Sequence, residues 1–197
     1  PAGSFPVLAG EERPTARRLV IATGSVPALP PVPGLQAGLE RGFVLTNREI
    51  LDLKALPASL VCIGGGVIGL EMACYFAGVG VPVTVLEMLP KLAGATDPEI
   101  CDVLMRTYEK EGMTFQLSAK VLEIGDGSVT YEDAGGRHTL PCEKVLPSAG
   151  RRPNVQGLNL EALGVQLDRG AVVTDRHLCT NVPGVYAVGD CNGKLML

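Results

Sequence analysis

Runs of apolar residues alternate with turn residues along the chain, and their lengths predict the elements. Residues 60–63 (LVCI) form a continuous apolar run, which is typical of a strand buried on both faces. A helix-compatible stretch follows, and residues 83–87 (VTVLE) predict a second strand. Residues 18–22 (RLVIA) predict another buried strand. These runs indicate an α/β protein with a parallel sheet.

Two helix starts and one connector are predicted from capping and proline patterns. Asp97-Pro98-Glu99 begins a helix in which apolar residues recur at helical spacing until Gly112. Residues 46–53 predict a short helix capped by Thr46, with Glu49 completing a capping box. The proline-rich residues 26–34 cannot enter a sheet interior or a helix, so they predict a connector.

Short β-rich runs fill the rest of the chain. After Gly112 they predict an antiparallel meander with turns at Gly125-Asp126-Gly127 and Gly135-Gly136, formed by TFQL (114–117), KVLEI (120–124), SVTYED (128–133) and HTLPCEKVL (138–146). The tail adds two strand candidates on either side of a Pro-Gly turn. The order predicts one α/β domain inserted into the sequence of another.

Composition narrows the function classes. The 197 residues are 46% hydrophobic with a formal net charge of −4, which is typical of a globular protein. The 17 basic residues form no long run, so we expect neither a nucleic-acid surface nor a polybasic membrane patch. The longest uncharged stretch, residues 72–86, is shorter than the roughly 20 residues of a membrane span. No signal peptide pattern is visible, and we expect a cytoplasmic protein.

The six cysteines show no close spacing, so the sequence predicts no metal site and no local redox disulfide. Cys62 and Cys74 lie in apolar runs and are expected in the core. Cys191 follows a Gly-Asp pair and is expected to be exposed.

A glycine cluster after the first strand carries the candidate chemistry. In Gly64-x-Gly66-x-x-Gly69 the first glycine allows a tight turn, the second allows close approach of a pyrophosphate, and the third allows helix–sheet packing. The following helix would offer its N-terminal amides to phosphate. The sequence therefore predicts a dinucleotide site rather than a purely structural turn.

Glu87 ends the second strand, 23 residues after Gly64, near the expected spacing of about 20 residues. A carboxylate there accepts hydrogen bonds from ribose hydroxyls and repels a 2′-phosphate, which favours NAD over NADP. The sequence favours two roles for Glu71 equally. Its charge could interact favourably with the helix dipole, or its side chain could contact the nicotinamide end of the cofactor.

Six ordered motifs resemble a central segment of the pyridine nucleotide–disulfide oxidoreductases, most closely their dihydrolipoamide dehydrogenase branch. The motifs are IATGS-x-P (21–27), GGGVIGLE (64–71), VTVLE (83–87), GMTFQLSAKV (112–121), SAGRRPN (148–154) and TNVPGVYAVGDCNGKLML (180–197). The resemblance implies a Rossmann-like NAD-binding domain at residues 36–150, inserted between partial FAD-binding strips at 1–35 and 151–197.

The resemblance also implies two sets of cofactor contacts. The FAD of the whole protein would meet Thr23, Gly24, Ser25, Met196 and Leu197, with Asp190 bonding the flavin's ribityl chain. Asp190 could otherwise be a turn-capping residue. The NAD site would be formed by Gly64, Gly65, Gly66, Val67, Ile68, Gly69, Leu70, Glu71, Glu87, Val121 and Gly150. Arg151 and Arg152 are read as solvated charges, and His138 and His177 as surface or structural residues.

By resemblance, the whole protein would pass electrons from a dithiol through FAD to NAD⁺. It would be a homodimer, with a 2-oxo acid dehydrogenase complex as a candidate assembly. The family's redox cysteine pair and its His–Glu pair find no match here, so we expect a central fragment that is inactive alone and in which no residue is catalytic. The alternatives are a sibling such as a mercuric reductase, NADH oxidase or coenzyme A-disulfide reductase, and a non-catalytic nucleotide-binding module.

Overall fold

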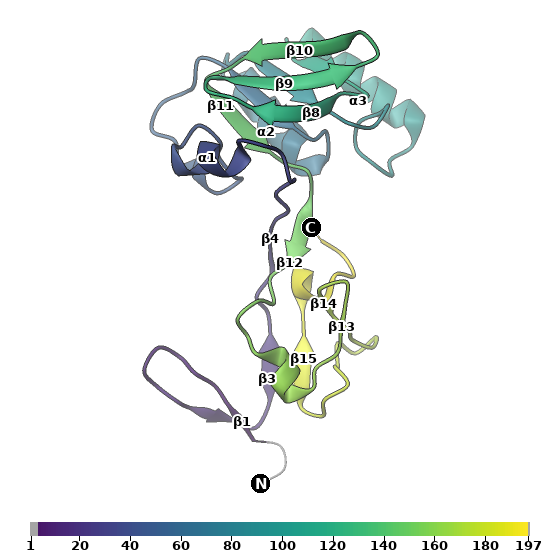
Figure 1. Ribbon diagram of the computed structural model, residues 1–197. Helices are drawn as coiled ribbons and strands as arrows, with labels where there is room; N and C mark the ends of the chain where they lie inside the picture. Colours follow the sequence, from purple (N-terminus) through teal and green to yellow (C-terminus); the bar gives the residue numbers. More distant parts are fainter. Residues whose placement is uncertain (1–3, 197) are drawn as a thin grey trace. The chain divides into compact units, whose positions relative to one another are not determined.

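The computed structural model describes residues 4–196, which divide into two compact units (Figure 1). The central unit comprises residues 27–150, and the flanking unit comprises the segments before and after it. Residues 27–35, grouped above with the FAD-binding strips, lie within the central unit. Leu35 is buried in that unit's core, and Ile124 donates its N–H to the carbonyl of Pro33, which explains the placement.

A four-stranded parallel sheet forms the middle of the central unit. Its strand order is β11-β5-β6-β7, and its strands are Lys144–Pro147, Leu60–Ile63, Val83–Leu86 and Thr114–Gln116 in that order. Helix α2 (Val67–Gly78) connects β5 to β6, and helix α3 (Pro98–Lys110) precedes β7. The predicted Rossmann-like parallel sheet is confirmed.

An antiparallel meander lies on one face of this sheet, formed by β8 (Lys120–Ile124), β9 (Ser128–Asp133) and β10 (Gly136–Pro141). Figure 1 shows the meander in front of the parallel sheet and the helices α2 and α3 behind it. The predicted combination of a parallel sheet with a meander is therefore present.

Side-chain alternation along β5 explains these layers. Val61 and Ile63 join the meander residues in one buried cluster, whereas Leu60 and Cys62 join Phe76 of α2 in another. Successive residues of a strand point to opposite faces, so an all-apolar strand needs a covering layer on each side.

Two of the predicted meander runs belong partly or wholly elsewhere. The TFQ residues of β7 pair in parallel with β6. The run at 138–146 is two strands, because β10 ends at Pro141 and β11 begins at Lys144, in parallel with β5. The error arose because a short apolar run does not reveal which strand it will pair with.

The short helices also differ from expectation. Residues 49–52 form a 3-10 helix, η1 (Glu49–Asp52), rather than a longer helix from Thr46. The Thr46–Glu49 contact is nevertheless present, because the Glu49 carboxylate accepts the Thr46 N–H at 2.8 Å and also its hydroxyl. Helix α1 (Leu35–Glu40) was not predicted. By contrast, α3 begins as expected, with the Asp97 carboxylate accepting the N–H of Glu99 at 2.9 Å.

The flanking unit consists of short strand pairs around its own core. In the paired order they are β1 (Phe5–Pro6) with β2 (Thr15–Ala16), β3 (Leu19–Ile21) with β15 (Val185–Ala187), β4 (Ser25–Pro27) with β12 (Arg151–Pro153), and β13 (Leu167–Asp168) with β14 (Ala171–Val172). The 3-10 helices η2 (Leu160–Leu163) and η3 (Gly189–Asn192) complete it.

Two burial predictions in this unit were wrong. Val20, in the middle of β3, is 58% exposed, because β3 pairs with β15 alone and nothing covers that face in the described part of the chain. Cys191 was expected at the surface but is fully buried, and its thiol lies 3.3 Å from the carbonyl oxygen of Ile21. Among residues 4–196, no helix combines the length and apolar character that crossing a bilayer would require.

Leu146 is completely buried in β11, and it tests the sandwich arrangement of the central unit. We expect Leu146→Ala to lower the free energy of unfolding by about 2–5 kcal/mol, because it leaves a cavity between the sheet and α2. Leu51 is 66% exposed, so Leu51→Ala should change the free energy of unfolding by less than about 0.5 kcal/mol. Urea unfolding followed by circular dichroism measures both, and equal losses would contradict the layer assignment.

Candidate functional site

The glycine cluster lies where the connections of the parallel sheet reverse direction. From β5 the chain proceeds through α2 to β6 and then β7 on one side, while β11 pairs on the other side. The turn after Ile63 therefore sits at the carboxyl edge of the sheet, at a topological switch point. Open α/β sheets bind ligands in the crevice at such points.

Gly64 and Gly69 are required by the packing of this turn. Gly64 has φ +108°, and a Cβ there would lie 2.7 Å from the carbonyl oxygen of Ser148. A Cβ on Gly69 would meet the Ser148 hydroxyl oxygen at 2.5 Å and the Gly64 carbonyl oxygen closer still. The Ser148 hydroxyl donates to the carbonyls of Ile63 and Gly64, at 3.2 and 3.0 Å. These two glycines bring β11, the turn and α2 into contact.

Gly66 differs from both of its neighbours in the motif. Its backbone is extended, with φ −78° and ψ −180°, a conformation open to any residue. No described heavy atom outside its chain neighbours and its own helix lies within 4 Å of the position that a Cβ would take. Neither backbone strain nor packing therefore requires glycine at this position.

Helix α2 begins directly at Gly66 and leaves its first amides available. Within residues 4–196, no side chain caps this N-terminus, and the first helical bond runs from the Leu70 N–H to the Gly66 carbonyl. The uncapped N–H groups and the helix dipole give the turn a partial positive charge. Such an end favours an anion.

The Glu87 carboxylate points at the same turn. Its Oε2 accepts the N–H of Gly65 at 2.6 Å, and its Oε1 accepts the N–H of Leu89 at 2.7 Å. Glu87 follows β6 directly and is half-buried. Two backbone bonds fix this acid beside the glycine turn.

The other proposed NAD contacts lie at different depths. Val67 is 67% exposed at the start of α2, Ile68 is half-buried and Leu70 is buried. Glu71 is exposed in the second turn of α2, where the dipole effect is already weak. Val121 lies on β8, half-buried against the core, and Gly150 has φ +122° with an open Cβ position.

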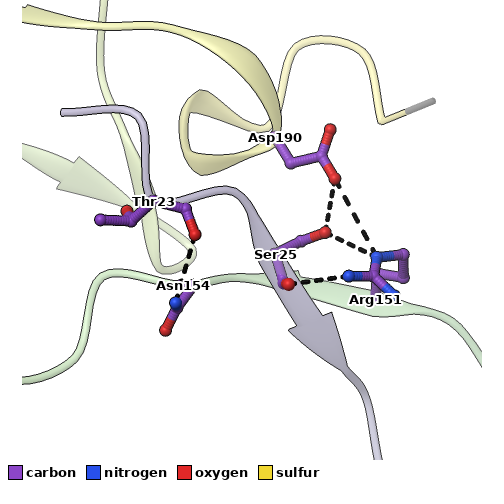
Figure 2. Close-up of polar contacts among 5 residues, drawn as sticks. All are labelled: Thr23, Ser25, Arg151, Asn154 and Asp190. Atoms are coloured by element: carbon purple, nitrogen blue, oxygen red, sulfur yellow. Dashed lines mark hydrogen bonds and ion pairs between the residues drawn. The ribbon is translucent and has the colours of Figure 1, made fainter. Parts of the chain in front are cut away.

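A second polar cluster lies in the flanking unit (Figure 2). The Arg151 Nε donates to the Ser25 hydroxyl at 2.6 Å, and that hydroxyl donates to Asp190 Oδ2 at 2.5 Å. Nearby, the Asn154 side chain donates to the Thr23 carbonyl at 3.2 Å. Three of the residues assigned to FAD by resemblance therefore lie together.

The remaining FAD candidates lie close by in the chain. Gly24 has φ +69°, and its carbonyl accepts the Asn154 N–H at 2.9 Å. Met196 is 36% exposed at the end of the described chain, and Leu197 lies outside the described residues.

The described cysteines and histidines show no redox or acid–base pair. All six cysteines are free, and burial raises the pKa of the Cys62 thiol to about 12. Cys142 is similarly affected, its pKa raised to about 11 by burial. The His138 ring bonds Asp133 at 2.9 Å, and this hydrogen bond lowers the pKa of the Asp133 carboxyl. The same ring stacks on Tyr131. These contacts are structural.

A family model described as pyridine nucleotide-disulphide oxidoreductase matches residues 6–197. The chain belongs to this family. Among curated members, dihydrolipoyl dehydrogenase of Acholeplasma laidlawii is 41% identical over 191 residues, which is 97% of the chain and 56% of that protein. Dihydrolipoyl dehydrogenase of Rhizobium etli is 38% identical over 95% of the chain and 39% of its own length.

Two solved structures have the same fold as this chain. The HOCl-induced flavoprotein disulfide reductase RclA of Escherichia coli matches with a TM-score of 0.86 at 30% identity, over 99% of the chain and 44% of RclA. LpdA of Mycobacterium tuberculosis matches with a TM-score of 0.79 at 31% identity, over 94% of the chain and 40% of LpdA. The chain thus spans about half of these family members or less.

Several residues at these sites had no assigned role in the sequence analysis, among them Asn154, which contacts Thr23 and Gly24. Ser148 shapes the glycine turn, and Leu92 packs against Gly65, where a Cβ would lie 2.6 Å from it. Arg151 is half-buried in the Ser25–Asp190 cluster rather than solvated. Ser148 and Arg151 belong to a motif noted in the sequence, whereas nothing near Leu92 signalled its contact with the turn.

The Gly69 contact can be tested by stability. We expect Gly69→Ala to destabilise the central unit by about 1–3 kcal/mol, because the added methyl overlaps the Gly64 carbonyl and Ser148. Gly78, at the other end of α2, has open space around its Cβ position, so Gly78→Ala is the matched control. Thermal unfolding measures both variants, and an unchanged melting temperature for Gly69→Ala would refute the packing role.

Proposed function

We propose that the central unit, which contains the predicted domain 36–150, binds NAD(H) at the turn from Gly64 to Gly69. The observation that carries this proposal is Gly66. Packing and backbone conformation account for glycine at 64 and 69 but not at 66, where the space beside the backbone is open. Close approach of a pyrophosphate to the backbone accounts for it.

The donors and acceptors of the site match the two halves of an adenosine diphosphate. The N-terminal amides of α2 donate to the anionic pyrophosphate. Glu87, held by Gly65 and Leu89, accepts from the ribose hydroxyls and repels a 2′-phosphate, which favours NAD over NADP.

The remaining contacts are proposed from the family resemblance. Val67, Ile68 and Leu70 extend the site along α2, and Val121 contacts the adenine. Glu71 and the Gly150 backbone lie toward the nicotinamide. An exposed Glu71 in the second turn of α2 supports the ligand reading over the dipole reading.

We propose that the whole protein is an FAD-dependent dihydrolipoamide dehydrogenase, the activity that the names of its relatives state. When bound, FAD supplies the redox chemistry between an enzyme disulfide and NAD⁺. The flanking unit would hold part of that FAD through Thr23, Gly24, Ser25, Asp190, Met196 and Leu197. A homodimer and a place in a 2-oxo acid dehydrogenase complex belong to the same proposal, as does a cytoplasmic location.

We further expect that this chain alone turns over no substrate. Its sequence contains no cysteine pair spaced five apart, and each of its cysteines is free. A chain with weak NAD(H) binding, no stable FAD and no activity is the expected result.

A sibling disulfide reductase is the second candidate for the whole protein. The observation that favours it is the likeness to RclA, which is named a flavoprotein disulfide reductase. Assay of the full-length protein with lipoamide separates the two, because we expect turnover of lipoamide only from a dihydrolipoamide dehydrogenase. A native reading frame confined to these residues would instead favour a non-catalytic nucleotide-binding module.

Gly66→Ser tests the proposed pyrophosphate contact. Serine is a preferred N-cap residue, so the fold should keep its stability, while the side chain occupies the open space and competes for the helix amides. We expect the dissociation constant for NADH to rise at least about tenfold, or about 1.4 kcal/mol. Fluorescence titration measures it, with melting temperature as the folding control.

Gly78→Ser is the matched variant for this test, since Gly78 also has open space but lies at the far end of α2. It should bind NADH as the parent chain does. Unchanged NADH affinity in Gly66→Ser would remove the main support for the site.

Glu87→Arg tests the basis of cofactor choice. Arginine replaces ribose-hydroxyl recognition by attraction for a 2′-phosphate, so the ratio of NADH to NADPH affinity should fall by about tenfold or more. The ratio is the useful quantity, because losing the Gly65 and Leu89 bonds also costs stability. Glu123→Arg, at an exposed position of β8, should leave the ratio unchanged. A preserved preference in Glu87→Arg would mean that another group selects the cofactor.

A further inference from the structure

Arg151, Ser25 and Asp190 form a hydrogen-bonded chain with a fixed direction (Figure 2). The guanidinium has donors but no acceptor, so Arg151 Nε donates to the Ser25 hydroxyl oxygen at 2.6 Å. The Ser25 proton is then committed to Asp190 Oδ2, at 2.5 Å. A second donor, Arg151 Nη2, bonds the Ser25 carbonyl at 2.7 Å and fixes the guanidinium plane.

This arrangement leaves one carboxylate oxygen of Asp190 for a ligand. The side-chain contacts of Asp190 within the described chain run to Oδ2, including the Arg151 ion pair at 4.0 Å, whereas Oδ1 projects away from the cluster (Figure 2). The Asp190 side chain is 20% exposed, so a ligand can reach it. An ionised carboxylate only accepts hydrogen bonds, and its charge repels anions.

The ligand group at Oδ1 must therefore be a hydrogen-bond donor without negative charge, and a hydroxyl is such a group. The glycine turn has the opposite requirement, because its amides favour an anion. A polyhydroxyl chain supplies the donor that Asp190 Oδ1 requires, and the ribityl chain of a flavin is such a group.

We propose that Arg151 is a positioning residue for flavin binding. Acting through Ser25, it orients Asp190 so that Oδ1 accepts a ribityl hydroxyl. The inference rests on the proposed function of the flanking unit, and it gives the Ser25 hydroxyl an internal role between Arg151 and Asp190 rather than a direct flavin contact.

The position of Arg151 in the fold supports this role. Ser25 lies on β4, Arg151 on the paired strand β12, and Asp190 in η3, so three segments distant in sequence meet at one carboxylate. The Arg151 and Asp190 side chains are only 23% and 20% exposed. Hydrogen bonds to charged partners are stronger in such partly buried places than at the surface.

The test follows the carboxyl carbon of Asp190 by nuclear magnetic resonance in the isotope-labelled full chain. Flavin mononucleotide is the first probe, added in large excess because we expect this chain to hold no stable FAD. Lumiflavin, the same ring without the ribityl chain, is the second probe at the same excess. We expect the Asp190 signal to shift with flavin mononucleotide and not with lumiflavin.

Four variants then separate positioning from general stability. Arg151→Met should weaken the binding of flavin mononucleotide by about tenfold, since it removes charged hydrogen bonds. Arg151→Lys should restore part of it, and Ser25→Ala should match Arg151→Met without adding to it in the double variant. Arg152→Met, at the exposed neighbouring position, should bind as the parent chain does.

Three results would overturn the proposal. They are an Asp190 signal that flavin mononucleotide does not move, an equal response to lumiflavin, and an affinity that Arg151→Met leaves unchanged. Unaltered amide signals elsewhere in the flanking unit show that each variant is folded. Failure of the NAD proposal would be seen separately, as an absence of NADH-induced shifts at the Gly65 and Gly66 amides.

Discussion

The contact between the turn after β5 and Ser148 after β11 is the constraint on which the central unit depends. Residues 84 positions apart meet there through the Ser148 hydroxyl and the Gly64 carbonyl. Gly69 brings the first turn of α2 against the same two groups. A Cβ at Gly64 or Gly69 would overlap Ser148, so the close packing of β5, the segment after β11 and α2 depends on these two small residues. The open space beside Gly66 is informative by contrast, because packing explains the glycines at positions 64 and 69 but not the one at 66.

The two units present opposite chemistry to their proposed ligands. The central unit offers backbone N–H groups at a helix start, and the flanking unit offers a carboxylate whose one oxygen is already bonded. The backbone N–H donors favour a phosphate, and the carboxylate acceptor favours a hydroxyl. The proposed sites would therefore distinguish the pyrophosphate of NAD from the ribityl chain of FAD by hydrogen bonding. Both units lie within the single match to the family model, at residues 6–197.

Local sequence signals predicted which residues form helices and strands. They did not predict which strands pair with one another. The run at 60–63 and the Asp97-Pro98 start carry their structure within a few residues, and both elements are present. Residues 114–116 and 144–147 pair within the parallel sheet rather than in the meander, because strand pairing depends on residues distant in sequence. Cys191 is buried for the same reason, since the Ile21 backbone that covers it lies 170 residues away. Arg151 resembled a solvated charge until β4 and η3 placed Ser25 and Asp190 beside it.

The Glu87 carboxylate bonds the Gly65 amide within the protein itself. A buried donor left without an acceptor is costly, and such a cost would tie a dinucleotide to the turn by penalising its departure. Here the donor keeps its acceptor whether or not a nucleotide lies beside it. The acid at the end of β6 therefore holds the backbone of the glycine turn in place by a bond internal to the protein, independently of any ligand.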